Sequence, residues 1–275
     1  MLKLPQADHS PLPSPALPLV VAQARYSPVR AEVTAEVVAA IQHRLRETVA
    51  VDLSRVAPLM STDIVIGPGV TVPPQVQHGM QLSAEDGQWQ ATVTPEWVSL
   101  ETPSFRSYAE DFRPVWGEVL GAVSDALAPV TVMRAGLRFV NVLKPPVELA
   151  AGAPVATCGW DRWIRGSLAG PAGDEWLLEG ALAYSQQMLV ESGQGVRSGV
   201  RSGPVENEDR PAFLLDIDTF SEPQAVWAVD DVVALFERLN GCGVALFQEL
   251  VTPEMLNHLR GSEAAGGHVR GKDLL

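Results

Sequence analysis

The sequence predicts an α+β fold in which long helices pack on one face of an antiparallel sheet. Residues 17–26 alternate between two sets of side chains and residues 130–143 are rich in β-branched residues, which is typical of strands. Residues 33–45 and 105–127 instead repeat apolar side chains every three or four positions, which is typical of helices. Because several strands precede each long helix, antiparallel pairing is favoured over a parallel sheet that alternates strand and helix.

Composition indicates an ordinary folded protein. The chain has 275 residues, of which 46% are hydrophobic and 19% charged. A chain of this length buries roughly three quarters of its unfolded surface, so its core needs no disulfide or metal for support. Acidic residues outnumber basic ones 33 to 20, giving a formal charge of -13. Such a field repels polyanions, so we expect neither nucleic acid nor an anionic membrane as a partner.

Cysteine content and hydropathy predict a cytoplasmic protein. Cys158 and Cys242 are far apart in the sequence, and neither belongs to a CxxC motif. Two isolated cysteines favour a reducing compartment, with neither a structural disulfide nor structural zinc. Prolines interrupt the first residues, so we expect no signal peptide there. No segment approaches the ~18 apolar residues of a membrane span.

The first part of the chain is predicted to contain strands, then a long helix. Residues 1–16 are rich in proline and should form an extended arm, after which a single domain covers 17–260. A helix start is expected at Ser27-Pro28, and Val33, Val37, Ile41 and Leu45 mark the buried side of that helix. The following elements are a Gly- and Pro-rich loop at 67–74, strands within 76–83, 87–94 and 96–102, helical structure at 104–127 with either a kink or a short helix meeting a longer one at Pro114, and a strand at 130–143.

The second part of the chain repeats this rhythm. Residues 144–175 are rich in Pro and Gly and should form a long irregular segment. The following elements are a strand at 176–192, a mobile hairpin or loop at 195–203 and a strand at 212–220. A helix capped by Asp230 or Asp231 comes next, and Gly241 and Gly243 indicate either a break in it or close packing. A short helix at 252–259 and a flexible tail at 261–275 end the chain. The domain would thus consist of two strand-then-helix halves, 17–143 and 176–260, joined by the irregular segment.

Four segments resemble a known bacterial family of uncharacterised, sporadically distributed proteins. They are PLVVAQARY, VMRAGLRFVNVL, FLLDIDTF and FQELVTPEMLNHL, which match the family's PLVE…RF strand, R-GLRYIN strand, LDID strand and closing helical segment. This chain departs from the pattern at Val21, Ala22 and Phe139 without changing the period. The resemblance spans residues 17–260 and implies no established activity. Sporadic occurrence is typical of mobile or accessory gene modules.

Charged residues on three predicted strands form the first candidate site. Alternation places Arg134 and Arg138 on one face of their strand, and Asp216 and Asp218 on one face of theirs. Arg25 has the same phase in the first strand. If these strands are neighbours, the side chains gather into a surface for anions or peptides, because guanidinium groups fit carboxylates and phosphates. The alternative is an internal ladder of ion pairs that sets the strand register. We predict in either case that Arg138 pairs with an acidic residue of the LDID strand.

Cofactor and metal sites are not predicted. Asp216-x-Asp218 lacks further carboxylates at a recognisable spacing, and the histidines and cysteines lack zinc-ligand spacing. The glycines of GQGVRSGVRSG lack the Lys-Ser/Thr of a phosphate-binding loop. No nucleophile has an identifiable base, so no catalytic residue is assigned, and enzymatic activity is left open.

Trp160 and Trp163 form the second candidate site, because they lie in the irregular segment. Exposed tryptophans are typical of binding surfaces, whereas tryptophans folded under a long loop belong to the core. We expect a non-catalytic binding or accessory protein, in which 144–175 contributes a surface for a protein or peptide partner. The alternatives are an enzyme or small-molecule-binding protein with a pocket between sheet and helices, and a homo-oligomer assembled through an exposed edge strand.

Overall fold

The computed structural model describes residues 2–10, 12–13, 16–27, 33–49, 51–63, 66–67, 70–71, 75–145, 159–169, 184–208 and 210–261. Ten strands of these residues form one antiparallel sheet in the order β2-β5-β6-β7-β1-β8-β11-β10-β9, with β12 pairing β8. The strands are β1 (Leu19–Tyr26), β2 (Arg55–Asp63), β5 (Gln75–Ser83), β6 (Gln90–Val93), β7 (Trp97–Thr102), β8 (Thr131–Leu143), β9 (Gln186–Gly193), β10 (Val196–Asn207), β11 (Arg210–Ser221) and β12 (Ala225–Val226).

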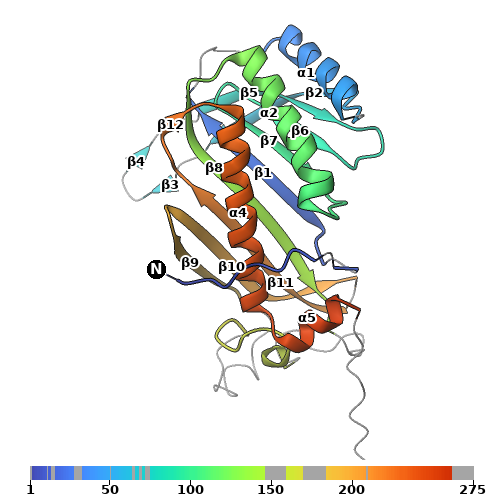
Figure 1. Ribbon diagram of the computed structural model, residues 1–275, viewed down its shortest axis with the longest axis vertical. Helices are drawn as coiled ribbons and strands as arrows, with labels where there is room; N and C mark the ends of the chain where they lie inside the picture. Colours follow the sequence, from blue (N-terminus) through green and yellow to red (C-terminus); the bar gives the residue numbers. More distant parts are fainter. Residues whose placement is uncertain are drawn as a thin grey trace, which may run out of the picture.

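The helices cover one face of this sheet (Figure 1). They are α1 (Ala35–Thr48), the π-helix η1 (Tyr108–Phe112), α2 (Arg113–Leu127), α4 (Val229–Leu250) and α5 (Pro253–Leu259). The α+β prediction is therefore confirmed. The division into two strand-then-helix halves is not confirmed. Strands of both predicted halves form one continuous sheet, with β1 and β8 near its middle.

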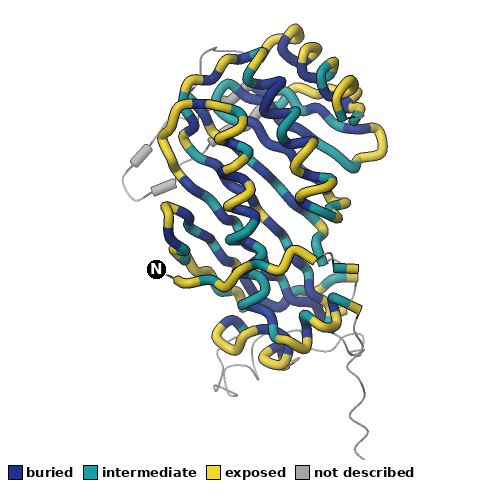
Figure 2. The backbone as a smooth tube through the Cα atoms, in the orientation of Figure 1, coloured by how far each residue is buried: buried dark blue, intermediate teal, exposed yellow. Residues whose placement is uncertain are grey.

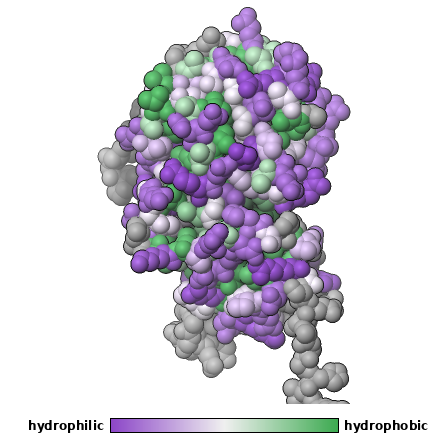
Figure 3. Space-filling model, viewed as in Figure 1, coloured by the Kyte–Doolittle hydropathy of each residue, from purple (hydrophilic) through white to green (hydrophobic). Residues whose placement is uncertain are grey.

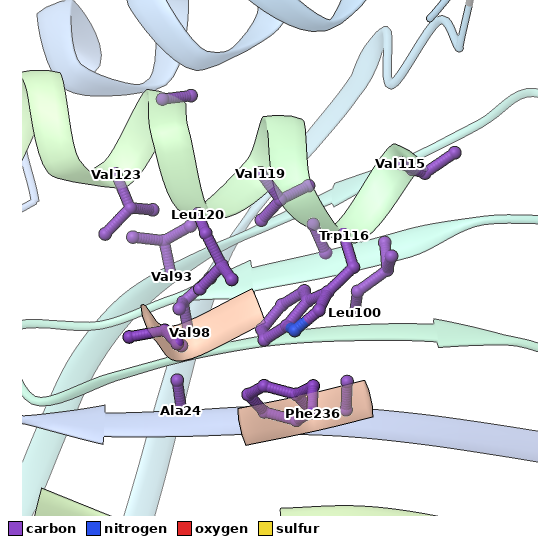
Figure 4. Close-up of a cluster of buried hydrophobic side chains, with 14 of the residues drawn as sticks. Ala24, Val93, Val98, Leu100, Val115, Trp116, Val119, Leu120, Val123 and Phe236 are labelled. Atoms are coloured by element: carbon purple, nitrogen blue, oxygen red, sulfur yellow. The ribbon is translucent and has the colours of Figure 1, made fainter. Parts of the chain in front are cut away.

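Alternation within the strands explains how the core forms. Along β1, every second side chain from Val20 to Tyr26 is buried toward the helices, whereas Arg25 on the other face is exposed. Trp116 of α2 contacts Phe236 of α4 edge-on, and both side chains lie beside Val98, Leu100 and other buried residues of the sheet (Figure 4). A second buried cluster lies under the C-terminal half of α4 and includes residues of β11 and α5.

Helix starts differ from the predicted ones. The structure begins α1 at Ala35, where the Thr34 side chain caps the helix by accepting a hydrogen bond from the Val37 N–H. Ser27-Pro28 is thus not the cap, because Thr34 offers a hydroxyl at the required spacing. Asp230 and Asp231 lie in the first turn of α4 instead of capping it, where their charge favours the positive end of the helix. The short helix η1 meets the longer helix α2 beside Pro114, where a kink or such a junction was predicted.

α4 is one continuous helix, so the predicted break at Gly241 and Gly243 does not occur. Gly243 instead permits close packing on the sheet. A Cβ atom at this position would lie 3.2 Å from both the Phe139 ring and the Thr219 hydroxyl. The absence of a side chain therefore brings the middle of α4 onto β8 and β11.

Two regions differ from the prediction. Residues 195–203 were predicted as a mobile hairpin or loop. Strands β9 and β10 do form a hairpin that turns at residues 194–195, but 196–203 lie within β10, where Val196, Ser198, Val200 and Ser202 are buried. In the duplicated Val-Arg-Ser-Gly, the Val and Ser side chains alternate with Arg and Gly. Small or apolar side chains therefore share one face, as expected of a strand that is covered on one side. Strand β2 was not predicted at all, and it lies at the edge of the sheet, where Pro58 is tolerated. Short strands β3 (Ile66–Gly67) and β4 (Val70–Thr71) pair within the predicted loop at 67–74.

The N-terminal arm crosses the helix-covered side of the molecule (Figure 2). Its Leu2 N–H donates to the Glu191 carbonyl of β9, and its Ala16 carbonyl accepts from the Val142 N–H of β8. Between these ends, Asp8 contacts Gln248 of α4 and Arg260. The described residues of the arm are therefore tied to distant elements of the fold. Of the predicted tail at 261–275, all residues after Gly261 lie outside the described residues.

Seen from the helix-covered side, the surface is mostly hydrophilic, with small hydrophobic areas between (Figure 3). None of the helices in the described part of the chain has both the length and the apolar character needed to cross a membrane.

Candidate functional site

The predicted Arg and Asp residues gather on the sheet face away from the helices, which we name the open face. Strands β1, β8 and β11 are consecutive neighbours, as the prediction required. Arg25 lies opposite Arg134, and Arg138 lies opposite Asp218. Like charges directly opposite each other destabilise a sheet unless each has a partner.

Each of these arginines has an acidic partner. Arg138 donates from Nε and Nη2 to the two carboxylate oxygens of Asp216, at 2.8 and 2.7 Å, which confirms the predicted pair. Arg134 donates to Asp218 over 2.8 Å, and Arg25 lies 3.6 Å from Glu96. The hydrogen bonds that Arg138 donates to Asp216 raise the pKa of Arg138 above its usual value.

Gly136 makes room for this arrangement. A Cβ atom there would lie 2.6 Å from a guanidinium nitrogen of Arg134, which extends over the glycine toward Asp218. The same guanidinium lies 4.7 Å from the centre of the Phe220 ring, and that of Arg197 lies 4.9 Å from it. These contacts join side chains of three neighbouring strands. They favour the predicted alternative of an internal ladder of ion pairs that sets the strand register.

The second candidate pair lies in the core. Trp160 and Trp163 are each only 2% exposed and belong to the cluster with Phe213 and Leu250. Trp160 packs against Phe213 with ring centres 5.3 Å apart. The partner-binding prediction required these tryptophans to be exposed, and neither is. Apolar residues of β11 and α4 cover both rings. Of the predicted irregular segment 144–175, the structure describes 144–145 and 159–169, and the others lie outside the described residues.

A cavity of about 470 Å³ lies on the opposite, helix-covered side of the sheet, and we name it the α4 cavity. Its walls come from the segment 105–113 around η1, α4 (237–248), Phe139 and Asn141 of β8, Leu256, Arg260, and from the arm Asp8, His9, Ser10, Leu12, Ala16 and Leu17. This volume is typical of pockets for small organic molecules. The walls are mainly apolar and include the rings of Phe105, Phe139 and Phe247.

Two residues of the cavity walls each carry one buried side-chain oxygen without a described partner. Tyr108 and Asn240 are 9% and 6% exposed, and neither the Tyr108 hydroxyl nor the Asn240 Oδ1 has a hydrogen-bond partner among the described residues. Burial raises the pKa of the Tyr108 hydroxyl, so this group is a neutral donor and acceptor at ordinary pH. Asn141, in contrast, donates to the carbonyl groups of Phe139 and Leu215. Most buried polar groups in proteins are satisfied, so the first two require an explanation.

Ion pairs surround the cavity. Arg113 lies 2.5 Å from Glu237, and Arg260 lies 2.5 Å from Asp8 of the arm. Hydrogen bonds from Ser10 and the nearby Arg260 lower the pKa of Asp8, which stays ionised at neutral pH. The arm is thereby held against α4 by charge and by Gln248, and it completes one wall of the cavity.

The residues of the α4 cavity were not predicted from the sequence. A pocket between the sheet and the long helices was one of the predicted alternatives. A signal was nevertheless present, because Asn240 interrupts the apolar stripe of α4 between Leu239 and Gly243. A polar residue at a core position is the kind of local conflict that functional sites produce. Nothing in the sequence connects Asn240 with Tyr108 or with the arm.

Within the part of the chain that the structure describes, no group of His, Cys, Asp and Glu side chains is arranged to hold a metal ion. Comparison with known proteins adds no assignment, because no family model, curated protein or solved structure matches the chain significantly.

Proposed function

We propose that the protein binds a small organic molecule in the α4 cavity. The observation that carries the proposal is a mainly apolar cavity of about 470 Å³, in whose walls Tyr108 and Asn240 each carry a buried side-chain oxygen without a described partner. A buried polar atom without a partner costs about 1–3 kcal/mol. A ligand that supplies hydrogen bonds to both atoms removes that cost when it binds.

The apolar rings supply affinity for the rest of the ligand. Burial of apolar surface contributes roughly 25 cal/mol per Å², and fixed polar groups determine orientation. Small-molecule binding was the alternative in the sequence analysis, and the cavity between α4 and β8 supports it.

A cavity-filling substitution tests this proposal. Val244 lies in the α4 wall, so Val244→Trp places an indole in the cavity. Ala234→Trp adds the same group to an exposed position of the same helix and serves as the control. We expect native mass spectrometry or thermal-shift screening to detect bound compounds with the wild type and the control, and not with Val244→Trp. The proposal is wrong if the wild type retains no compound and responds to none more than Val244→Trp does.

We also propose a second function, the binding of a protein or peptide partner on the open face. The favouring observation is an apolar area beside the arginines: Leu189 of β9 is 63% exposed, and half-buried Phe220 lies between two guanidinium groups. Aromatic residues and arginines are frequent in binding hot spots. If this function is correct, Leu189→Glu abolishes capture of an identified partner, whereas Ala234→Glu on α4 does not.

A further inference from the structure

The acidic and arginine side chains of the α4 cavity walls already have oppositely charged partners. They belong to Asp8, Arg106, Arg113, Glu237 and Arg260. Arg113 lies 2.5 Å from Glu237, and Arg260 lies 2.5 Å from Asp8. Arg106 lies 3.7 Å from Asp111, and its side chain is 82% exposed, so water reaches it freely. Each carboxylate and guanidinium of these walls is therefore matched by an opposite charge on a described residue.

Aromatic and aliphatic side chains form most of the remaining wall surface. Phe105 and Phe139 meet edge-on with ring centres 5.9 Å apart, and Val244 and Phe247 extend this surface along α4. Leucines of the arm and of α5 add further apolar groups, namely Leu12, Leu17 and Leu256. Side chains of this kind favour hydrocarbon, because its burial removes apolar surface from water. They offer no hydrogen bonds to replace the water around an ion.

A charged ligand would find no free partner in these walls. An ion that leaves water without gaining an opposite charge or hydrogen bonds loses its hydration at a large cost in free energy. An anion could reach Arg113 or Arg260 only in competition with Glu237 or Asp8, whose carboxylates would repel it. A cation would meet the same conflict with the two arginines. An uncharged molecule enters without disturbing either ion pair.

We propose that the ligand of the α4 cavity is an uncharged, mainly hydrocarbon molecule, and that the Arg113–Glu237 pair is a determinant of this preference. The inference rests on the function proposed for the cavity and assigns the chemical class of the ligand. A hydroxyl or carbonyl group on such a molecule is compatible with the walls, because removal of a neutral polar group from water costs far less than removal of an ion.

The experiment compares three probes with the same eight-carbon chain, namely octan-1-ol, octanoate and octylammonium. Isothermal titration at neutral pH measures their affinities in about 0.15 M salt, where charges more than about 8 Å apart are largely screened. We expect the wild type to bind octan-1-ol at least about tenfold more tightly than either ion, because the ion loses hydration without gaining a partner. The formal charge of -13 attracts octylammonium and repels octanoate, so it cannot explain weak binding of both.

Removal of one charge from the Arg113–Glu237 pair should change the preference in a defined direction. Glu237→Gln leaves the Arg113 guanidinium without its carboxylate, so this variant should bind octanoate at least about fivefold more tightly than the wild type does. Arg113→Gln leaves the Glu237 carboxylate without its cation and should strengthen octylammonium binding by about the same factor. Octan-1-ol carries no charge, so its affinity should stay the same in both variants.

Two further variants serve as controls. Glu222→Gln removes the charge of a comparable half-exposed carboxylate, whose partner Arg197 lies over Phe220 on the open face, and should change none of the affinities. Val244→Trp fills the cavity and should abolish the binding of octan-1-ol. If octan-1-ol binds this variant as tightly as the wild type, the alcohol is not in the cavity and the inference falls.

Binding of either ion at least as tight as that of octan-1-ol to the wild type overturns the inference and leaves the cavity proposal standing. Unchanged affinity for both ions in Glu237→Gln and Arg113→Gln also overturns it, because the pair then does not determine the preference. If no probe binds while another compound is retained by the wild type and lost in Val244→Trp, a charged compound refutes the chemical class alone and an uncharged one supports it. If nothing binds in any of these assays, both proposals fail.

Discussion

Removal of Arg138 tests whether the ion pairs of the open face support the fold. The Asp216 side chain is only 9% exposed and accepts two hydrogen bonds from Arg138, which is itself 46% exposed. Breaking a fully buried pair costs about 3–5 kcal/mol, whereas exposed pairs contribute up to about 1 kcal/mol. Since one partner is buried and water reaches the other, we expect Arg138→Met to lower the free energy of unfolding by about 2 kcal/mol. Urea titration followed by tryptophan fluorescence measures this change.

The matched control is Arg134→Met, on the same strand and face. Its partner Asp218 is 38% exposed, so water replaces the lost contact and the cost should stay below about 1 kcal/mol. The double variant Arg138→Met/Asp216→Leu leaves no unpaired buried charge and should recover most of the loss. The reasoning is refuted if Arg138→Met costs no more than Arg134→Met, or if the double variant is as unstable as Arg138→Met.

Three further substitutions have defined outcomes. Asn240→Leu should raise the free energy of unfolding of the ligand-free protein by about 1–2 kcal/mol, because it removes a buried unpartnered oxygen; a loss in urea titration would contradict this. Trp160→Ala should lower the same quantity by about 3–5 kcal/mol, because the indole is buried against Phe213; an unchanged melting temperature would show that it is not core. Asp8→Asn should speed proteolysis of the arm at neutral pH. Because the pKa of Asp8 is lowered, its anchoring is present above the usual carboxyl pKa and is lost as pH falls through the lowered value; equal cleavage of wild type and variant at neutral pH would exclude this anchor.

Periodic hydrophobicity was sufficient to predict most of the elements and one side-chain contact. The strands at β1, β8 and β11 have period two, so the phase of Arg138 relative to Asp216 followed from the sequence. The same reasoning could not establish that β8 and β11 are neighbours, and the prediction was conditional on that point. The division into two strand-then-helix halves was not confirmed, and β8 of the first part pairs with β11 of the second, so strands of both parts belong to one sheet.

Features that depend on contacts between distant segments were not predictable. Trp160 and Trp163 lie among glycines and prolines in the sequence, and they are buried because they pack against residues of β11 and α4 that are distant in the chain. The α4 cavity requires Tyr108, Asn240 and the arm to come together, and no local pattern connects them. Strand β2 was missed because Pro58 argues against a strand, and only its place at the sheet edge resolves the conflict. The suspected family membership stays a prediction.

The contacts of the N-terminal arm have a consequence for biosynthesis. During translation the arm is made first, but its partners at 142, 191, 248 and 260 emerge later. Strand β1 is likewise made before β7 and β8, the two strands that pair with its edges. Chains emerge from the ribosome at about 5–20 residues per second, so these apolar strands wait for several seconds without their partners. The α4 cavity is complete only once Arg260 has emerged from the ribosome and formed its ion pair with Asp8, so this wall forms after the strands and helices that precede it in the chain.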